Sequence, residues 1–407
     1  MYPSHNRFRL PAILLLVGAF LSPLLRADEA TDFGACVDSL KTRARAEGVS
    51  AAVTDQVLDQ VRYVERVIEL DRKQPEFTRS FAQYYNARVT QGRVDKGRAL
   101  LQEHKVLLDK VYRATGVPPH YLVAFWGLET NFGSYLGKMA VPSSLATLAC
   151  DPRRSEFFTI ELLTALKIVD EGDVSAQQLV GSWAGAMGQM QFMPSTFARY
   201  AVDGDGDGRR DLWGSVADAM TSAGQFLQGL GWEPGLRWGR EVRLPEGFDY
   251  TLAGRQTRKP LAEWVALGVR KAGDEPLPPL SLEASILVPG GAGGPAFITY
   301  ENFHVIMRWN RSEFYALSVG RLAERISGGG KLRRPALDDG LRFTNELIME
   351  LQTNLKTLGF DVGEPDGVFG PQSRAALRGF QTSQGLLADG YPTLELLEQV
   401  SRVAQQQ

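Results

Sequence analysis

Cysteine and histidine are scarce in this chain of 407 residues, which has 2 cysteines and 4 histidines. The histidines beyond the N-terminal segment are His104, His120 and His304; none lies near a cysteine, and no Gly-x-Ser-x-Gly motif occurs. Zinc sites and nucleophilic triads are therefore not expected. No glycine-rich nucleotide-binding motif precedes a predicted helix. The 45 basic side chains nearly balance the 47 acidic ones, which gives no indication of a nucleic-acid partner. The chemistry should rest on carboxylates and neutral polar side chains.

The N-terminus has the pattern of an export signal over residues 1–27. Arg7 and Arg9 precede an uncharged run from Leu10 to Leu25, and Ala27 is a small residue at which cleavage can occur. The run is shorter than the roughly 20 residues that a spanning helix needs, although an uncleaved anchor is an alternative. We expect an exported mature chain without a membrane span.

The two cysteines, Cys36 and Cys150, form an even pair in a chain bound for an oxidising compartment. A disulfide between them is one interpretation, and two buried thiols are the other. The sequence does not show whether the pair comes within bonding distance.

Hydrophobic periodicity predicts a mainly α (α+β) protein that is helical from Asp28 to about Ile168. Ser215 is typical of a helix cap, with its helix running to Leu230, and the helical pattern returns from Asn302 to Ile326. Between them, residues 232–300 are expected to form a small β insertion. The clearest amphipathic stretches are Val57–Leu70, Val94–Thr115 and Phe157–Val169, and the expected strands are Glu241–Leu244, Ala284–Val288 and Ala296–Tyr300.

A glycine-rich segment suggests a domain boundary after residue 326. Residues 327–340, which begin Ser-Gly-Gly-Gly-Lys, are typical of a flexible linker. The remainder, 341–407, contains three short helical patterns and is long enough for a small separate module. These patterns cover Glu346–Leu358, Gln372–Ser383 and Thr393–Val403. The sequence thus divides into a signal (1–27), a large domain (28–326), a linker and a three-helix module.

Glu129 is the candidate acid. Pro118 and Pro119 suit the start of a helix, and helical spacing places Phe125 and Trp126 on the same side as Glu129. Partial burial disfavours the charged form of a carboxyl group, so we expect a pKa raised toward that of a general acid. The alternative is a glutamate that ends a helix and points into solvent.

A glycine-rich stretch, residues 181–188, is predicted to be a loop that lets backbone approach a ligand closely. Ser182, Gln189 and Gln191 supply neutral hydrogen-bonding groups there, and the alternative is a packed structural turn. Several aromatic side chains could stack on a ligand ring or fill the core: Trp126, Trp183, Phe192, Trp213, Phe303 and Trp309.

An aspartate-rich loop resembles an EF-hand. Asp203, Asp205, Asp207 and Asp211 occupy positions 1, 3, 5 and 9, and Gly208 stands at position 6. Arg209 would contribute its backbone carbonyl. Position 12 is Gly214 rather than glutamate, so Asp218 would have to close the cage. Calcium over residues 203–218 is the predicted ion, and an acidic turn without metal is the alternative.

Together these stretches resemble the B-type (family 3) lytic murein transglycosylases, exported bacterial enzymes that act on the cell-wall glycan. The resemblance runs from about Cys36 to Ile326. The motifs that carry it are Trp126-Gly127-Leu128-Glu129, Asp151-Pro152-Arg153-Arg154, Gly185–Ser195, Asp203–Trp213 and Glu301–Ile306. It implies a lysozyme-like α-rich catalytic domain, a periplasmic location, no organic cofactor and peptidoglycan strands as the partner of a monomer.

The resemblance also implies roles for single residues. Glu129 would be the only acid/base and give 1,6-anhydromuramoyl products, while Ser182, Gln191 and Asn310 would line the substrate cleft. Trp309 and Phe303 are the aromatic residues expected to bind substrate. The family usually has tyrosine where Trp309 stands. Tryptophan lacks the hydroxyl, so the sequence does not decide whether this residue makes a hydrogen bond, but its ring can still stack on a sugar.

The C-terminal piece resembles a peptidoglycan-binding module of type 1, through Asp366-Gly367-Val368-Phe369-Gly370 and Phe380-Gln381 followed by Gly385-Leu386. Two alternatives to a lytic transglycosylase stay open. A hydrolytic muramidase would need a second carboxylate, and a non-catalytic wall-binding scaffold would not need Glu129.

Overall fold

The computed structural model describes residues 23–73, 79–338, 340 and 342–406. Most of the expected export signal, residues 1–22, lies outside these residues. Among the described residues, no helix is long and apolar enough to cross a membrane.

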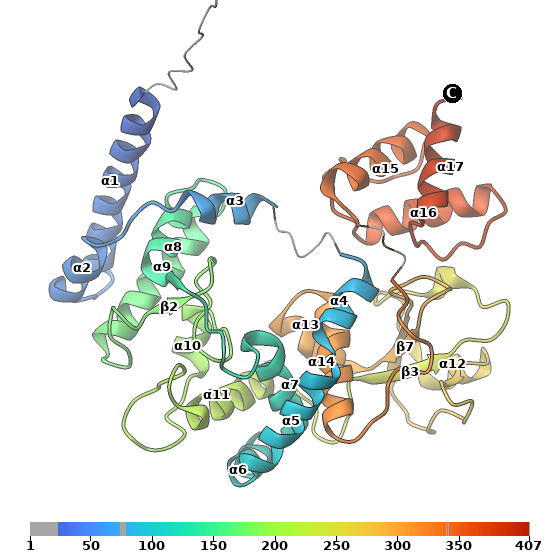
Figure 1. Cartoon of the computed structure of the whole chain (residues 1–407), viewed down its shortest axis with the longest axis horizontal. Coiled ribbons are helices and arrows are strands. Elements are labelled where there is room, and N and C mark those ends of the chain that lie inside the picture. The colour runs from blue at the N-terminus through green and yellow to red at the C-terminus, as the bar shows by residue number, and fades with distance from the viewer. Residues whose placement is uncertain (1–22, 74–78, 339, 341, 407) are drawn as a thin grey trace, which may run out of the picture.

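The large domain is mainly helical, as the periodicity predicts (Figure 1). Helix α7 lies at its centre and packs against α5, α6 and α14. The helices of the first half are α1 (Pro23–Ala46), α2 (Ala51–Leu58), α3 (Glu65–Lys73), α4 (Phe81–Arg88), α5 (Gln91–Glu103), α6 (Lys105–Thr115), α7 (Pro119–Thr130), α8 (Val141–Ala149) and α9 (Ser155–Asp170). Those that follow are α10 (Pro194–Tyr200), α11 (Val216–Gly229), α12 (Leu261–Ala266), α13 (Glu301–Trp309) and α14 (Glu313–Ile326).

Three stretches predicted as continuous helices are interrupted. Val57–Leu70 is divided between α2 and α3, Val94–Thr115 breaks at His104, and Asn302–Ile326 breaks between Trp309 and Glu313. At the last break the Asn310 Oδ1 atom accepts the Ser312 N–H at 3.1 Å, and Ser312 Oγ then caps α14 by accepting the Tyr315 N–H. These local side-chain bonds compete with the helical backbone pattern.

The β insertion contains a five-stranded antiparallel sheet in the order β4-β6-β7-β3-β5. Its own core includes Trp264 and Ile298, both fully buried. The three longer strands confirm the sequence prediction closely, whereas the two-residue strands have no readable pattern. The strands are β3 (Gly239–Arg243), β4 (Lys259–Pro260), β5 (Arg270–Lys271), β6 (Glu283–Leu287) and β7 (Ala296–Thr299); Tyr250–Leu252 form a 3₁₀ turn, and β1 (Met139–Ala140) pairs with β2 (Val180–Gly181) elsewhere.

The C-terminal module consists of α15 (Asn345–Thr357), α16 (Pro371–Ser383) and α17 (Leu394–Ala404) around a small core that includes Leu355, Leu377 and Val400. It stands beside the sheet end of the large domain (Figure 1). Arg378 of the module donates to the Ala253 carbonyl at 2.8 Å, and Asp389 accepts the Ala292 N–H at 2.8 Å.

The segment predicted as a flexible linker is held along the large domain. Buried Glu241 accepts the backbone N–H groups of Arg333 and Arg334 at 2.9 and 2.8 Å, and Asn86 donates to the Ala336 carbonyl. The module is thus fixed in place rather than freely tethered.

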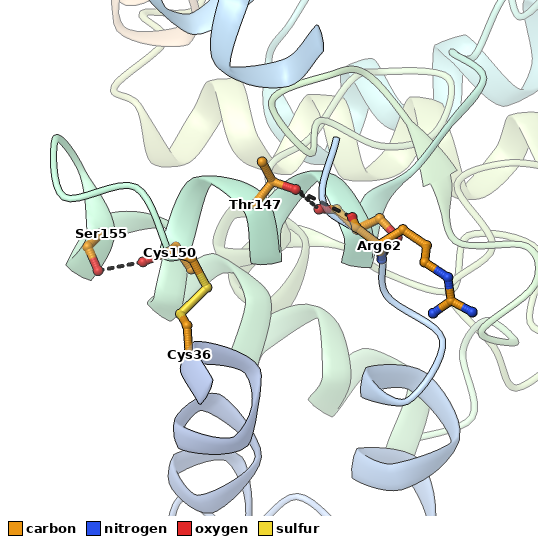
Figure 2. The surroundings of a disulfide bond; sticks show 7 residues. Cys36, Arg62, Thr147, Cys150 and Ser155 are labelled. Carbon is orange, nitrogen blue, oxygen red and sulfur yellow. Dashed lines mark hydrogen bonds between the residues drawn. A yellow bond between two sulfur atoms is a disulfide. The ribbon is translucent and has the colours of Figure 1, made fainter. Parts of the chain in front are cut away.

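Cys36 and Cys150 form a disulfide that closes a sequence separation of 114 residues. Figure 2 shows the bond joining α1 to the end of α8, where Ser155 Oγ donates to the Ala149 carbonyl at 2.6 Å. Of the two interpretations that the sequence left open, the structure has the bridged one.

Candidate active site

Helix α7 carries Glu129 in its last turn. Pro118 is the N-cap and Pro119 the first helical residue, where proline loses no intrahelical hydrogen bond. Every residue from Tyr121 to Leu128 is buried, so the helix axis is fixed by packing on all sides. Glu129 itself is half-buried. The helix therefore delivers one carboxylate from a rigid element to the edge of the core.

The backbone that follows Glu129 is in an unusual conformation. Asn131 and Phe132 have φ values of 51° and 61°, in the left-handed region that non-glycine residues seldom adopt. Gly133 continues the turn at φ 74°, and its N–H is bound by Thr130 Oγ1 at 3.0 Å. Such strained residues persist only where the surroundings hold them, which is common at functional sites.

The glutamate turn and the glycine-rich loop meet in space. Thr130 Oγ1 donates to the Gln189 carbonyl at 2.8 Å, and Gln189 in turn donates its backbone N–H to Leu212 at 2.8 Å. A side chain on Gly133 would approach Gln189 Oε1 at 2.8 Å, so the two segments pack too closely to admit one. The turn after Glu129 and the glycine-rich loop are therefore in direct contact.

Backbone contacts shape the glycine-rich loop. Ser182 donates its backbone N–H to the Ala186 carbonyl at 2.8 Å, and its Oγ accepts the Ala186 N–H at 3.0 Å. Gln191 has φ 49°, and its Nε2 donates to the carbonyls of Leu136 and Gly188 at 3.2 and 3.1 Å. Both side chains are only partly buried, so each can also face a ligand.

Two aromatic side chains donate hydrogen bonds to Glu129. The Trp309 indole N–H reaches Oε1 at 2.9 Å, and the Tyr315 hydroxyl reaches the same oxygen at 2.5 Å. The hydrogen bond that the sequence left open at position 309 is therefore present, from an indole in place of a hydroxyl. Phe125 and Phe226 pack on the Trp309 ring with centroid distances of 4.5 and 4.9 Å, which fixes its orientation.

Tyr315 is a functional candidate that sequence reasoning missed. Burial and the charge of Glu129 raise the pKa of its hydroxyl well above the usual value of 10.0. The hydroxyl therefore stays protonated at neutral pH and remains a donor. Hydrogen bonds to a carboxylate favour its ionised form, whereas burial favours the neutral acid. Glu129 is thus a partly buried carboxyl group with two fixed hydrogen-bond donors on one oxygen.

Other expected aromatic positions are structural. Phe303 is fully buried in the main core near Trp238, so its ring has no face for a ligand, and the expectation that it binds substrate is wrong. Trp126 packs against His104 and Phe132 in the core. Asn310 is half-exposed beside Trp309 at the α13–α14 break.

The aspartate-rich loop brings three of its predicted ligands together. Carboxylate oxygens of Asp203, Asp205 and Asp218 lie within 4.8 Å of one another. Asp218 is fully buried, which raises its pKa, and it accepts N–H groups from Gly204 and Asp211 at 2.7 and 2.6 Å. Asp203 has a lowered pKa because the N–H groups of Gly208, Gly206 and Asp207 bind it. Within the described residues, Asp207 and Asp211 stand outside this cluster: their carboxylates accept the N–H groups of Arg209 and Trp213.

Comparison with known proteins identifies two family matches. Residues 32–324 match the transglycosylase SLT domain, and residues 344–400 match a putative peptidoglycan binding domain. The membrane-bound lytic murein transglycosylase B of Escherichia coli is 31% identical over 290 residues, which cover 67% of this chain and 77% of that protein.

Solved structures agree in fold. A crystal structure of SltB3 from Pseudomonas aeruginosa in complex with NAG-anhNAM-pentapeptide has a TM-score of 0.86 and 44% identity, covering 91% of this chain and 99% of that one. The Escherichia coli lytic transglycosylase Slt35 in complex with calcium has a TM-score of 0.63 and 27% identity, covering 72% of this chain and 92% of that one.

Proposed function

The chain belongs to the transglycosylase SLT-domain family of lytic transglycosylases, lyases that act on peptidoglycan in cell-wall remodelling, and we propose that Glu129 is its single acid/base. In this proposal Glu129 protonates the oxygen that leaves C1 of N-acetylmuramic acid as the β-1,4 bond to N-acetylglucosamine breaks. The resulting carboxylate takes the proton of the muramoyl 6-hydroxyl as that oxygen attacks C1. The product is a 1,6-anhydro sugar, and no water is consumed.

The hydrogen bonds to Oε1 are the observation that carries this proposal. Trp309 and Tyr315 hold one oxygen of Glu129 and stabilise the carboxylate left after proton donation. The same group must act first as acid and then as base, which a half-buried carboxyl with fixed donors can do at neutral pH.

Substrate contacts are assigned to the polar groups around Glu129. Ser182 and Gln191 would bind sugar hydroxyl or acetamido groups from the glycine-rich loop, and Asn310 from the break between α13 and α14. Trp309 contributes its hydrogen bond to Glu129 and a partly exposed ring edge. Phe303 has no place in this set because it is buried.

We also infer an exported, periplasmic and monomeric enzyme. The Cys36–Cys150 bond is typical of an oxidising compartment. The module of residues 341–407 would bind the wall beside the active site and raise the local concentration of substrate.

Calcium is the proposed ion of the aspartate loop. Three convergent carboxylates are hard oxygen ligands, which suit Ca²⁺. Asp218 would close the cage, and the carbonyl of Arg209 with Asp207 and Asp211 would complete it only after the loop adjusts. Slt35 in complex with calcium is the relative that supports this choice.

The test of the catalytic proposal is Glu129→Gln, which keeps size and hydrogen bonding but removes the proton relay. Turnover of purified peptidoglycan should fall by at least about 10³-fold, while binding of the insoluble polymer in a pull-down stays the same. The matched control is Glu246→Gln, an exposed position on the β insertion. A Glu129→Gln variant that keeps wild-type turnover would reject the assignment.

A further inference from the structure

A cavity of about 330 Å³ lies between the C-terminal module and the large domain. Its wall on the large-domain side includes Arg311 and Glu313, and its wall on the module side includes Phe369, Arg374 and Tyr391. The walls are held together by the Arg378–Ala253 and Ala292–Asp389 hydrogen bonds. The cavity is therefore part of a fixed interface.

Positive charge dominates the lining. Five arginines border the cavity against one acidic residue, Glu313, which pairs with Arg255 at 3.6 Å. Arg311 is exposed and has no hydrogen-bond or ion-pair partner among the described residues. The arginines are Arg79, Arg255, Arg311, Arg374 and Arg378.

The module side adds further attraction for an anion. Arg374 lies over the Phe369 ring at 5.3 Å, and no carboxylate of the described residues is within salt-bridge distance of it. Burial and the neighbouring Arg374 lower the pKa of Arg378 to about 10, so the two guanidinium groups repel each other. Gly370 and Pro371 bring the N-terminus of α16, which has no side-chain cap, to the same space.

The cavity is adjacent to the catalytic residues through α14. Glu313 lines the cavity, and Tyr315 donates its hydroxyl hydrogen bond to Glu129. The two residues are two positions apart, about 3 Å along the axis of α14. Arg311 follows Asn310 directly. The segment that carries Trp309 and Tyr315 therefore separates a ligand group in the cavity from Glu129.

We propose that this cavity binds the free carboxylate end of the stem peptide carried by the muramoyl unit at the active site. This inference rests on the proposed function. A peptide attached through its amino end leaves a free carboxylate, and five residues can extend by up to about 17 Å. The arginines bind the carboxylate and Phe343, Phe369 and Tyr391 pack on the peptide. The lactyl carboxylate of a bare glycan would leave most of a 330 Å³ cavity unfilled.

The experiment compares two tetrasaccharides, one with pentapeptides on its muramic acids and one bare. In the full-length Arg311→Gln/Arg374→Gln variant, kcat/KM for the peptide-bearing substrate should fall about tenfold while the value for the bare one is unchanged. Arg311→Gln alone, at an exposed position, should give a smaller loss of the same kind. Arg113→Gln, at an exposed position of α6, is the matched control. Equal losses on both substrates, or no loss, would overturn the proposal.

Binding separates this inference from the catalytic one. In a Glu129→Gln background, calorimetric titration with the peptide-bearing tetrasaccharide should show a Kd weakened about tenfold by the two arginine changes. If the wild type makes no anhydro product, the catalytic proposal fails, and this titration still decides the cavity. An unchanged Kd would overturn the cavity proposal whatever the catalytic result.

Discussion

At the scale of the residue, Glu129 was readable from the sequence because helical spacing shows which side chains accompany it along α7. The other neighbours of Glu129 could not be predicted from the sequence. Trp309 and Tyr315 come from distant segments, and helical periodicity carries no information about which segments meet. The raised pKa expected of Glu129 stays a prediction. The expectation that Phe303 binds substrate was wrong, because the sequence does not distinguish an aromatic ring in the core from one at a cleft.

Tyr315→Phe tests the second donor. The change keeps the buried ring but removes the hydroxyl that binds Oε1, so we expect kcat to fall by about 10- to 100-fold with little change in KM. Removing a donor disfavours the carboxylate form, so the acidic limb of the pH–rate profile should move to higher pH. Because the pKa of the hydroxyl is raised, Tyr315 does not ionise near neutrality and contributes no alkaline limb there. Steady-state kinetics from pH 4 to 9 measures both effects. An unshifted acidic limb contradicts this role.

At the scale of the element, the sequence predicted which helices and strands exist, but not where a helix is interrupted. The strands β3, β6 and β7 and the helices of the module follow alternation and amphipathic patterns that the sequence displays. The break between α13 and α14 is made by side-chain hydrogen bonds of Asn310 and Ser312, which compete with a helical pattern that continues through them. That break lets Trp309 and Tyr315 converge on one carboxylate. The functional geometry thus depends on the feature that periodicity hides.

Asp218→Asn tests the aspartate loop as a calcium site. Wild-type protein should gain about 2.7 kcal/mol of unfolding free energy at a calcium concentration of 100 times Kd. Asp218→Asn should lose this calcium-dependent gain, because the buried carboxylate closes the cluster. Asp207→Asn should lose less of it, because Asp207 stands outside the preformed cluster and joins the cage only after the loop adjusts. The raised pKa of Asp218 also predicts weaker binding as pH falls toward that pKa, since protonation removes a ligand. Thermal unfolding with calcium and with chelator measures the difference, and equal melting temperatures for the wild type in both would count against a bound ion.

At the scale of the whole molecule, sequence reasoning separated the parts but not their assembly. The glycine-rich start of residues 327–340 suggested a free tether, yet Glu241 and Asn86 bind its backbone. Each of these contacts joins residues that are far apart in the sequence, so no local sequence pattern predicts them. As a result the module stands at a fixed place beside the sheet and shapes a cavity next to the active site.

The disulfide should contribute to global stability. A bridge that closes 114 residues removes loop entropy from the unfolded chain worth about 5 kcal/mol in the chain-entropy model. The Cys36→Ser/Cys150→Ser variant should therefore show a lower urea midpoint, and the wild type should match it after reduction. The bond joins α1 to the end of α8, whereas Glu129 is carried by α7, so kcat should be preserved while the protein is folded. A midpoint unaffected by reductant would show that the bridge is absent or inert.

The most direct test of the central claim, that Glu129 drives an intramolecular ring closure, is mass spectrometry of the products formed from purified peptidoglycan in oxygen-18-labelled water. The account predicts muropeptides one water lighter than hydrolysis products, carrying no label and absent with Glu129→Gln. Hydrated reducing ends that carry the label would contradict it and identify a muramidase with a second catalytic carboxylate.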